Sequence, residues 1–196
     1  MHKATKGEET KKSILEAGLD MASQIGLEQV TIGALAKVTG LSKSGLFAHF
    51  QSRENLQIEI LQYAGQLFAG SVLIPALQTK AGIARIKQLV SNWNTWDSQL
   101  TGGCVFVSAC NDYKDRPGKV RDFVVAQQQE WLGSLRRLAQ SAIDADDFRG
   151  DADEEQFAFE LYSFLLGFHL YDKILESKNP RARQDKALSR LIANYQ

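Results

Sequence analysis

Hydrophobic residues recur every three or four positions along almost the whole chain, which is the spacing of an amphipathic helix. The first such run places its apolar face on Ile14, Ala17, Met21 and Ile25. Gly26 follows this run and predicts a left-handed stop at the end of the helix. Gly18 lies inside the run, where a glycine costs about 1 kcal/mol relative to alanine. We therefore expect compensating packing or a neighbouring helix that comes close at Gly18.

Between residues 30 and 56 the pattern breaks into shorter pieces, each with a hydroxyl residue where a helix would begin. The predicted N-caps are Thr31, Ser42 and Ser52. Leu41 and Leu46 flank the second cap at the spacing of a hydrophobic staple, and Gly40 ends the helix before it. Two short helices joined by a tight turn, both packed on a longer first helix, predict a helix-turn-helix.

Longer amphipathic segments follow residue 55, separated by Gly102-Gly103, Pro117-Gly118 and Asn179-Pro180. Asp151 and Glu154 have the spacing of a capping box in front of a strongly apolar helix. Residues 104–113 fit a strand or a buried helix, and their helical neighbours favour a helix. The whole pattern predicts an all-α chain of about nine helices, with a three-helix domain at 1–55 and a larger helical domain at 56–196.

Composition adds little that points to nucleic acid. The 196 residues are 44% hydrophobic and 23% charged with a formal net charge of zero, and residues 1–60 also balance seven basic against seven acidic side chains. Binding to nonspecific DNA should therefore be weak, because it depends on neutralising phosphates. The N-terminal residues lack an apolar signal region, and no stretch has the uninterrupted apolar length of a membrane span, so we expect a cytoplasmic protein without a membrane partner.

The helix predicted to begin after Ser42 has two distinct faces. Leu46 and Phe50 lie four residues apart and should point into the core of the small domain. At 100° per residue, Ser44 and Ala48 then face outward, with Gly45 beside them. The flanks and first turn carry Phe47, His49 and Lys43. Small residues let a helix backbone approach the major groove, and an aromatic edge can contact a thymine methyl, so this face suits a DNA recognition helix.

The same region carries a signature. It runs through Val30-Thr31-Ile32, Leu35-Ala36, Gly40 to Phe47, His49-Phe50 and Arg53-Glu54-Asn55-Leu56. These residues resemble the DNA-binding signature of the tetracycline-repressor (TetR) family. The resemblance implies a ligand-responsive repressor that binds a palindromic DNA operator. It also implies that the second domain holds an internal pocket for a small-molecule effector and dimerises through its last two long helices.

The resemblance also implies which residues face DNA. They are Thr31, Lys43, Ser44, Phe47, His49 and Arg53, and capping or close approach adds Ser42, Gly45 and Ser52. Two positions depart from the family, since Phe47 replaces the usual tyrosine and Arg53 the commoner lysine. Contact at Phe47 must then be apolar, and Arg53 keeps the charge with a different geometry. Taken singly, the hydroxyl residues are equally explained as helix caps.

The second domain offers weaker candidates. The expected effector-binding residues are Trp93, Trp96, Phe106, Phe123, Trp131 and His169. The expected dimer face carries Leu161, Phe164, Phe168, Leu188, Leu191 and Tyr195, with Gly167 allowing close helix approach. Packing within the chain is the alternative for both sets, and a hydrogen-bonded structural role is the alternative for His169.

Other function classes find little support. Gly40 and Gly45 have P-loop spacing but lead into Leu46 and Phe47 rather than the required Lys and Ser or Thr. The acidic run from Asp144 to Asp153 lacks calcium-loop spacing. We predict no enzyme activity, cofactor or metal. Two alternatives stay open: a helical ligand-binding or protein-interaction module without operator binding, and a regulator that responds to a protein partner.

Cys104 and Cys110 are too few for a disulfide framework and fit a reducing compartment. Six residues on a helix place them on different faces, so neither a metal pair nor an intrahelical disulfide is expected. We expect buried, inert thiols, and a redox-sensing role is the lesser alternative.

Overall fold

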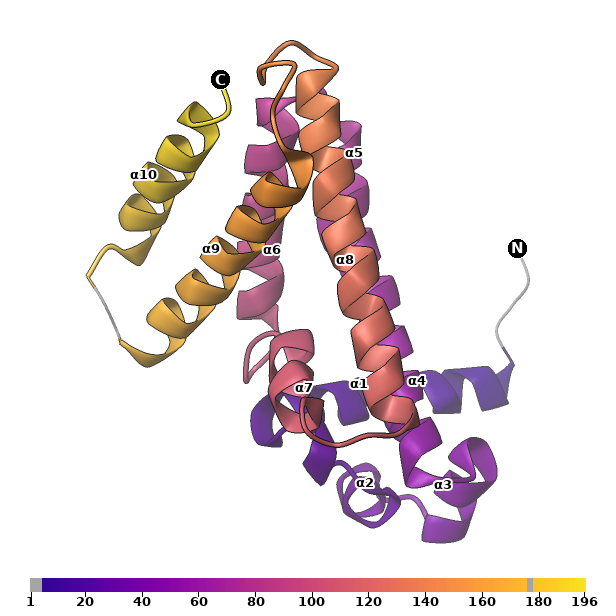
Figure 1. The fold of residues 1–196 in the computed structure, drawn as a ribbon. Helices are drawn as coiled ribbons and strands as arrows, with labels where there is room; N and C mark the ends of the chain where they lie inside the picture. Colours follow the sequence, from indigo (N-terminus) through magenta and orange to yellow (C-terminus); the bar gives the residue numbers. More distant parts are fainter. Residues whose placement is uncertain (1–4, 176–177) are drawn as a thin grey trace. The chain divides into compact units, whose positions relative to one another are not determined.

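The structure is a computed structural model that describes residues 5–175 and 178–196, and these residues are helical with no strand. The helices are α1 (Lys6–Ile25), α2 (Ile32–Thr39), α3 (Lys43–Phe50), α4 (Arg53–Phe68), α5 (Ile74–Gln78), α6 (Ile83–Gln99), α7 (Val105–Tyr113), α8 (Lys119–Ile143), α9 (Glu154–Ile174) and α10 (Pro180–Ala193) (Figure 1). A 3-10 turn, Leu27–Gln29, precedes α2, and a π-helical turn, Ala69–Leu73, joins α4 to α5. The all-α prediction is confirmed, and residues 104–113 are helical as expected.

The chain forms two compact units. The first contains the residues up to Ala69 together with Ser98–Val125, and the second contains Gly70–Asp97 together with Ala126–Gln196. The first unit contains the segment predicted as a domain at 1–55, together with residues 56–69 and a segment from the middle of the chain.

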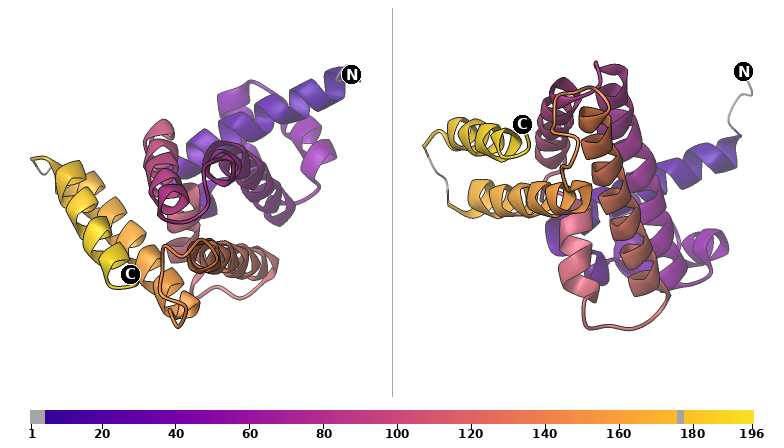
Figure 2. Two further views of the ribbon diagram at one scale, coloured as in Figure 1. Left: turned by 90° about the horizontal axis from the view of Figure 1, so that it is seen from above. Right: turned by 45° about the horizontal axis from the view of Figure 1, so that its top comes forward.

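In the first unit, α1 packs against α2, α4 and α7 around one apolar core. Thr5 caps α1, and its side chain forms a capping box with Glu8. A Cβ at Gly18 would lie 2.7 Å from Cδ1 of Ile60 on α4, which confirms the close approach expected at this glycine. Figure 2 shows α1 crossing α4 in two further views.

Buried hydrogen bonds fasten the segment 98–125 to the first unit. The Tyr113 hydroxyl on α7 donates to Oε1 of Gln57 at 2.8 Å, and Nε2 of Gln57 donates to the Leu27 and Val30 carbonyls. Gln57 is thus buried with both its amide oxygen and its amide nitrogen hydrogen-bonded, which is the condition for burying a polar group without a large loss of stability. At the other end of the segment, the Gly102 amide donates to the Ser23 hydroxyl.

In the second unit, α9 and α10 lie side by side (Figures 1 and 2). The rings of Phe148, Phe157 and Tyr195 form a cluster with centroids 5.0–5.6 Å apart. The capping box expected from Asp151 is wrong, because Asp153 caps α9 by accepting from the amides of Glu155 and Gln156. α10 begins with Pro180 directly after Asn179, as expected.

The continuous helical stretch Arg53–Gln78 is long and apolar enough to cross a membrane by length and composition alone. The core helix of a soluble protein passes the same test. Within the first unit, Leu56, Ile60 and Leu61 of this stretch are buried in the apolar core. Packing therefore accounts for this part of its apolar character.

Candidate DNA interface

All three predicted N-caps of the helix-turn-helix are present. The side chains of Thr31, Ser42 and Ser52 accept from the amides of Ala34, Gly45 and Asn55, each at 3.0 Å. Gly40 takes the left-handed conformation between the two short helices, with a φ of 69°. Because a hydroxyl that accepts from an amide still has a proton to donate, capping leaves Thr31 and Ser52 able to donate to a phosphate oxygen.

The two faces of α3 have the predicted character. Leu46 and Phe50 are fully buried in the core of the first unit. Ser44, Gly45 and Ala48 are exposed, and Phe47 is 56% exposed although it is a large apolar side chain. Leu41 differs from expectation, because it is 39% exposed and the outer half of the staple lies open to solvent. The helix is therefore fixed by two side chains rather than three.

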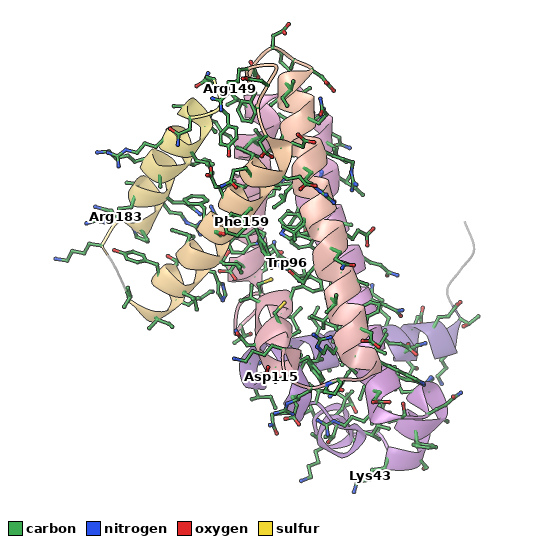
Figure 3. The ribbon with its side chains drawn as sticks, in the orientation of Figure 1. Lys43, Trp96, Asp115, Arg149, Phe159 and Arg183 are labelled. Carbon is green, nitrogen blue, oxygen red and sulfur yellow. The ribbon has the colours of Figure 1, made fainter. Side chains whose placement is uncertain are left out.

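Lys43 and His49 border this face. Lys43 is exposed and points away from the protein (Figure 3), and its side chain passes close to Gly33 on α2. His49 is half-buried, and its ring lies 6.0 Å from the ring of Phe50. We call Lys43, Ser44, Gly45, Phe47, Ala48 and His49 the α3 face. It combines small exposed residues, the exposed ring of Phe47 and the Lys43 cation, with the half-buried His49 at its edge.

Arg53, the predicted phosphate contact at the first residue of α4, is engaged in an ionic network. Its Nη2 donates to the backbone carbonyl of Glu28 and lies 3.1 Å from Oε1 of the same residue. Nη1 of Arg116 lies 2.7 Å from that oxygen, so two guanidinium groups share one carboxylate. The hydrogen bond from Arg53, and then that from Arg116, lowers the pKa of Glu28 below its ordinary value. Glu28 therefore stays ionised at neutral pH.

The sequence did not single out Glu28 or Arg116. Arg116 lies in the turn between α7 and α8, and its pairing with Glu28 spans 88 positions of the chain, from 28 to 116. Neither residue has a local pattern that predicts the pair. The one available signal was the basic turn around Pro117, which carries Lys114, Arg116, Lys119 and Arg121. A cleft of about 200 Å³ lies beside the network and is lined by Arg53, Glu54, Gln57, Tyr113, Arg116 and Arg121 among others.

The expected effector-binding residues divide between the two units. Phe106 and Phe123 pack against the core of the first unit, where the Phe106 ring meets Phe68 edge-on at 5.8 Å. Trp93, Trp96 and His169 are buried in the second unit, and Trp131 is half-buried there. Of this set, Trp93 and His169 contact each other edge-on with centroids 6.2 Å apart.

His169 is hydrogen-bonded, as the structural alternative expected. Its Nδ1 lies 2.8 Å from Oδ1 of Asp97, a residue that is almost completely buried on α6. Lys173 donates to the backbone carbonyl of Asp97 and lies 3.8 Å from its Oδ2. A carboxylate on Nδ1 fixes the orientation of the imidazole and leaves Nε2 as the ring nitrogen that remains for another partner.

The expected dimer face is mostly covered within the chain. Leu161, Phe168, Leu188 and Tyr195 are buried, while Phe164 and Leu191 are half-buried. The exposed apolar side chains of α9 are others, namely Phe159, Leu170 and Ile174, with Leu175 just after the helix. Gly167 has no neighbour within 4 Å of an added Cβ, so no other helix among the described residues approaches it closely. It opens onto a groove of about 390 Å³ between α9 and α10, with Phe164, Tyr171, Pro180, Arg183 and Ala187 in its walls.

Cys104 directly precedes α7, and Cys110 lies in the middle of this helix. Among the described residues, no group of three or more His, Cys, Asp or Glu side chains could hold a metal ion. Cys104 is buried. Burial, and to a smaller extent the neighbouring Cys104, raises the pKa of Cys110 to about 11. A thiol with such a pKa is almost entirely protonated at neutral pH and therefore a poor nucleophile.

Comparison with known proteins agrees with this architecture. Residues 14–60 match the bacterial regulatory proteins of the tetR family, and residues 82–188 match the tetracyclin repressor-like C-terminal domain. The transcriptional regulator RutR of Escherichia coli K12, described as HTH-type, is 40% identical over 52 residues, which cover 26% of this chain and 24% of RutR.

Two solved structures show the same fold over nearly the whole chain. A TetR-family regulator from Cytophaga hutchinsonii superposes with a TM-score of 0.84 at 18% identity, covering 100% of this chain and 98% of that one. AibR, solved with isovaleryl coenzyme A and operator DNA, superposes with a TM-score of 0.72 at 19% identity, covering 92% and 97% of the two chains. Since the C-terminal match alone spans more than half of the sequence, the chain belongs to the TetR family of bacterial regulatory proteins.

Proposed function

We propose that this regulator is a cytoplasmic homodimer that represses transcription from a pseudo-palindromic operator and is released by a small-molecule effector. The observation that carries the DNA-binding part is the α3 face, where Phe47 is 56% exposed between Ser44 and Ala48 while Leu46 and Phe50 fill the core. A monomeric domain gains nothing from an exposed phenylalanine. A major groove gives it a partner, because thymine methyl groups are apolar.

The α3 face reads bases, and its surroundings contact the backbone. Gly45 and the neighbouring small residues let α3 enter the groove, while Lys43 and His49 supply donors to base edges or phosphates. Thr31 and Ser52 each present a hydroxyl at a helix N-terminus, where free amides and the helix dipole favour a phosphate. Arg53 adds charge beside Ser52. This division between base and phosphate contacts is the usual one in protein–DNA interfaces.

The dimer is proposed from α9, which is apolar almost all round. Its buried side carries Leu161, Leu165 and Phe168. At 100° per residue, Phe159, Leu170 and Ile174 lie within about 60° of one another on the opposite side. We call these three residues the α9 stripe. A helix that is apolar on both sides is normally buried on both, and a second copy of this chain provides the missing cover.

The effector site is proposed within the second unit. Trp93 offers an apolar surface, and His169, oriented by Asp97, presents Nε2 as the remaining polar group. Most small-molecule sites combine apolar walls with a few oriented polar groups in this way. AibR supports an effector-responsive regulator, since its structure contains both isovaleryl coenzyme A and operator DNA. Effector binding would favour a dimer with mismatched recognition helices, at a coupling energy of about 1–3 kcal/mol.

The test is operator capture. The purified full-length protein is mixed with fragments of its own genome, and the retained DNA is sequenced and used in gel shifts at several salt concentrations. We expect a short inverted repeat, bound by two chains, with half-sites about 34–36 Å apart or a multiple of that distance. Retention of fragments without a shared motif, or binding equal to that of random DNA, would reject the proposed function and favour an interaction module.

A further inference from the structure

The Glu28 carboxylate joins a residue of the helix-turn-helix to one that lies far outside it. Arg53 belongs to the first turn of α4, the position proposed above to contact a DNA phosphate. Arg116 belongs to the turn before α8 and is more than half exposed. Both approach the same oxygen, Oε1 of Glu28, at 3.1 Å and 2.7 Å, whereas Oε2 accepts from Gln29.

One oxygen cannot serve two guanidinium groups and remain an equally strong partner for each. A carboxylate paired with Arg53 alone would cancel the charge that attracts a phosphate. With Arg116 present, the three side chains carry a net charge of +1, from two guanidinium groups and one carboxylate. Because both arginine side chains are about half exposed, each pair is weak enough to be exchanged for a phosphate contact.

The surroundings permit this exchange. Arg53 uses only Nη2 toward Glu28, so its other N–H groups can meet a phosphate. The cleft of about 200 Å³ beside the network gives the Arg53 and Arg116 side chains room to move. The backbone around them is fixed, because Gln57 and Tyr113 are buried and hydrogen-bonded and the Glu28 amide donates to Asp112 at 3.3 Å. Side chains, rather than helices, are therefore the parts with room to rearrange.

We propose that Arg116 is a positioning residue for DNA binding, which competes with Arg53 for Glu28 and thereby sets how much of the Arg53 charge is available to a phosphate. This inference rests on the proposed operator binding. It assigns a role in DNA affinity to the turn between α7 and α8, outside the helix-turn-helix. Arg116 itself need not contact DNA.

The test measures operator affinity and its salt dependence for variants of the full-length protein. Arg116→Gln leaves Glu28 to Arg53 alone, so the dissociation constant should rise about 3- to 10-fold and the salt slope should become shallower by up to about one ion. Arg116→Lys should restore part of the affinity, because it keeps the charge but loses the planar fork. Glu28→Gln should have the opposite effect, with tighter binding and a steeper slope.

The double variant decides whether Arg116 acts through Glu28. In the Glu28→Gln background, Arg116→Gln should cost much less affinity than it does in the wild-type protein. Arg136→Gln is the matched control, since the Arg136 side chain is about as exposed as that of Arg116 and pairs with Glu155 at 2.8 Å, and this variant should bind as wild type. Thermal unfolding of every variant checks that the fold is unchanged.

Three results overturn the inference. Equal losses from Arg116→Gln in both backgrounds would show that Arg116 acts independently of Glu28. Wild-type affinity and slope in both single variants would show that the network has no part in binding. If the wild-type protein itself binds no operator, the proposed function fails and this inference fails with it. In the first two outcomes the wild-type protein still binds its operator, so only the inference fails.

Discussion

The α3 face and the α9 stripe both expose large apolar side chains, but they expose them in different ways. On α3 a single ring, Phe47, lies among small and polar residues, and the opposite side of the helix fills a core. On α9 the stripe of Phe159, Leu170 and Ile174 runs along the helix, each side chain being more than half exposed. A groove of about 390 Å³ lined by Phe164 and Tyr171 lies next to it, on the α10 side.

This difference separates two kinds of partner. A lone aromatic side chain with small neighbours buries little apolar area against another protein. It fits the major groove of DNA, where a single thymine methyl group can contact it. A continuous apolar stripe has no use in a DNA groove and matches the apolar centre of a protein interface. The exposed pattern of each helix is thus the ground on which we propose its partner.

The largest effect is expected from charging the α9 stripe. Leu170→Asp combined with Ile174→Asp places two carboxylates where the second copy would pack, while both positions are solvent-exposed in the single chain. The variant should be a folded monomer. Operator affinity should fall by about 100-fold or more, because the avidity of two linked half-site contacts is lost. Light scattering after gel filtration and gel shifts measure the two effects.

Leu77→Asp is the control for this prediction. Leu77 on α5 is 59% exposed, comparable to the residues of the α9 stripe, but it lies on another helix. Its variant should remain dimeric and bind the operator. A dimeric Leu170→Asp/Ile174→Asp protein would show that the α9 stripe is not the interface.

The α3 face belongs to a unit that is assembled from segments distant in the sequence. A substitution at Gly102 tests the packing between two of these segments. A methyl group at Gly102 would overlap the backbone carbonyl of Ser23 at the end of α1, and backbone cannot give way as a flexible side chain can. Gly102→Ala should therefore lower the free energy of unfolding by about 3 kcal/mol or more. Gly7→Ala, where nothing lies within 4 Å, should have almost no effect in the same urea titration. Equal stability of the two variants would contradict the close approach.

Adjacent residues of α3 should separate stability from DNA binding. Leu46→Ala removes a fully buried side chain and should lower the free energy of unfolding by about 2–5 kcal/mol. Phe47→Ala should leave stability unchanged and weaken operator binding by about 1–2 kcal/mol, roughly 5- to 30-fold, mainly at sites with a thymine in contact. Urea titration and gel shifts on operator variants give both numbers. A destabilised Phe47→Ala protein would mean that the ring packs on its own chain.

The replacement of Lys43 and His49 on the α3 face should affect binding specificity alone. Lys43→Ala combined with His49→Ala should abolish the preference for the operator over random DNA while leaving the dimer intact, because neither side chain is part of a core. Competition gel shifts with operator and random DNA measure that preference. Normal operator binding by this variant would refute the assignment of the α3 face.

Local patterns predicted the helix-turn-helix well because its determinants are close in sequence. Ser42 caps its helix three residues from its partner amide, and Leu46 and Phe50 share a face because they lie one turn apart. The pairing of Glu28 with Arg116 and the packing of Gly102 on Ser23 depend on folding, and no spacing reveals them. The dimer residues stay a prediction for another reason: α9 is apolar on both sides, so periodicity does not tell which side faces its own chain.

The smallest effect on DNA binding is expected from modification of the two thiols. With a pKa of about 11 instead of the ordinary 9.0, Cys110 should have about 100-fold less thiolate at pH 8 than an unperturbed thiol, and its alkylation by iodoacetamide should slow in proportion. The rate should rise about tenfold per pH unit until the pKa is approached. Mass spectrometry of the Cys104→Ser variant follows Cys110 alone, with a short cysteine peptide as the reference thiol.

Operator binding should be the same before and after mild oxidation, since neither the α3 face nor the α9 stripe contains a thiol. Fast alkylation at neutral pH would contradict the raised pKa of Cys110, and loss of binding on oxidation that Cys110→Ser prevents would establish the redox role that burial argues against.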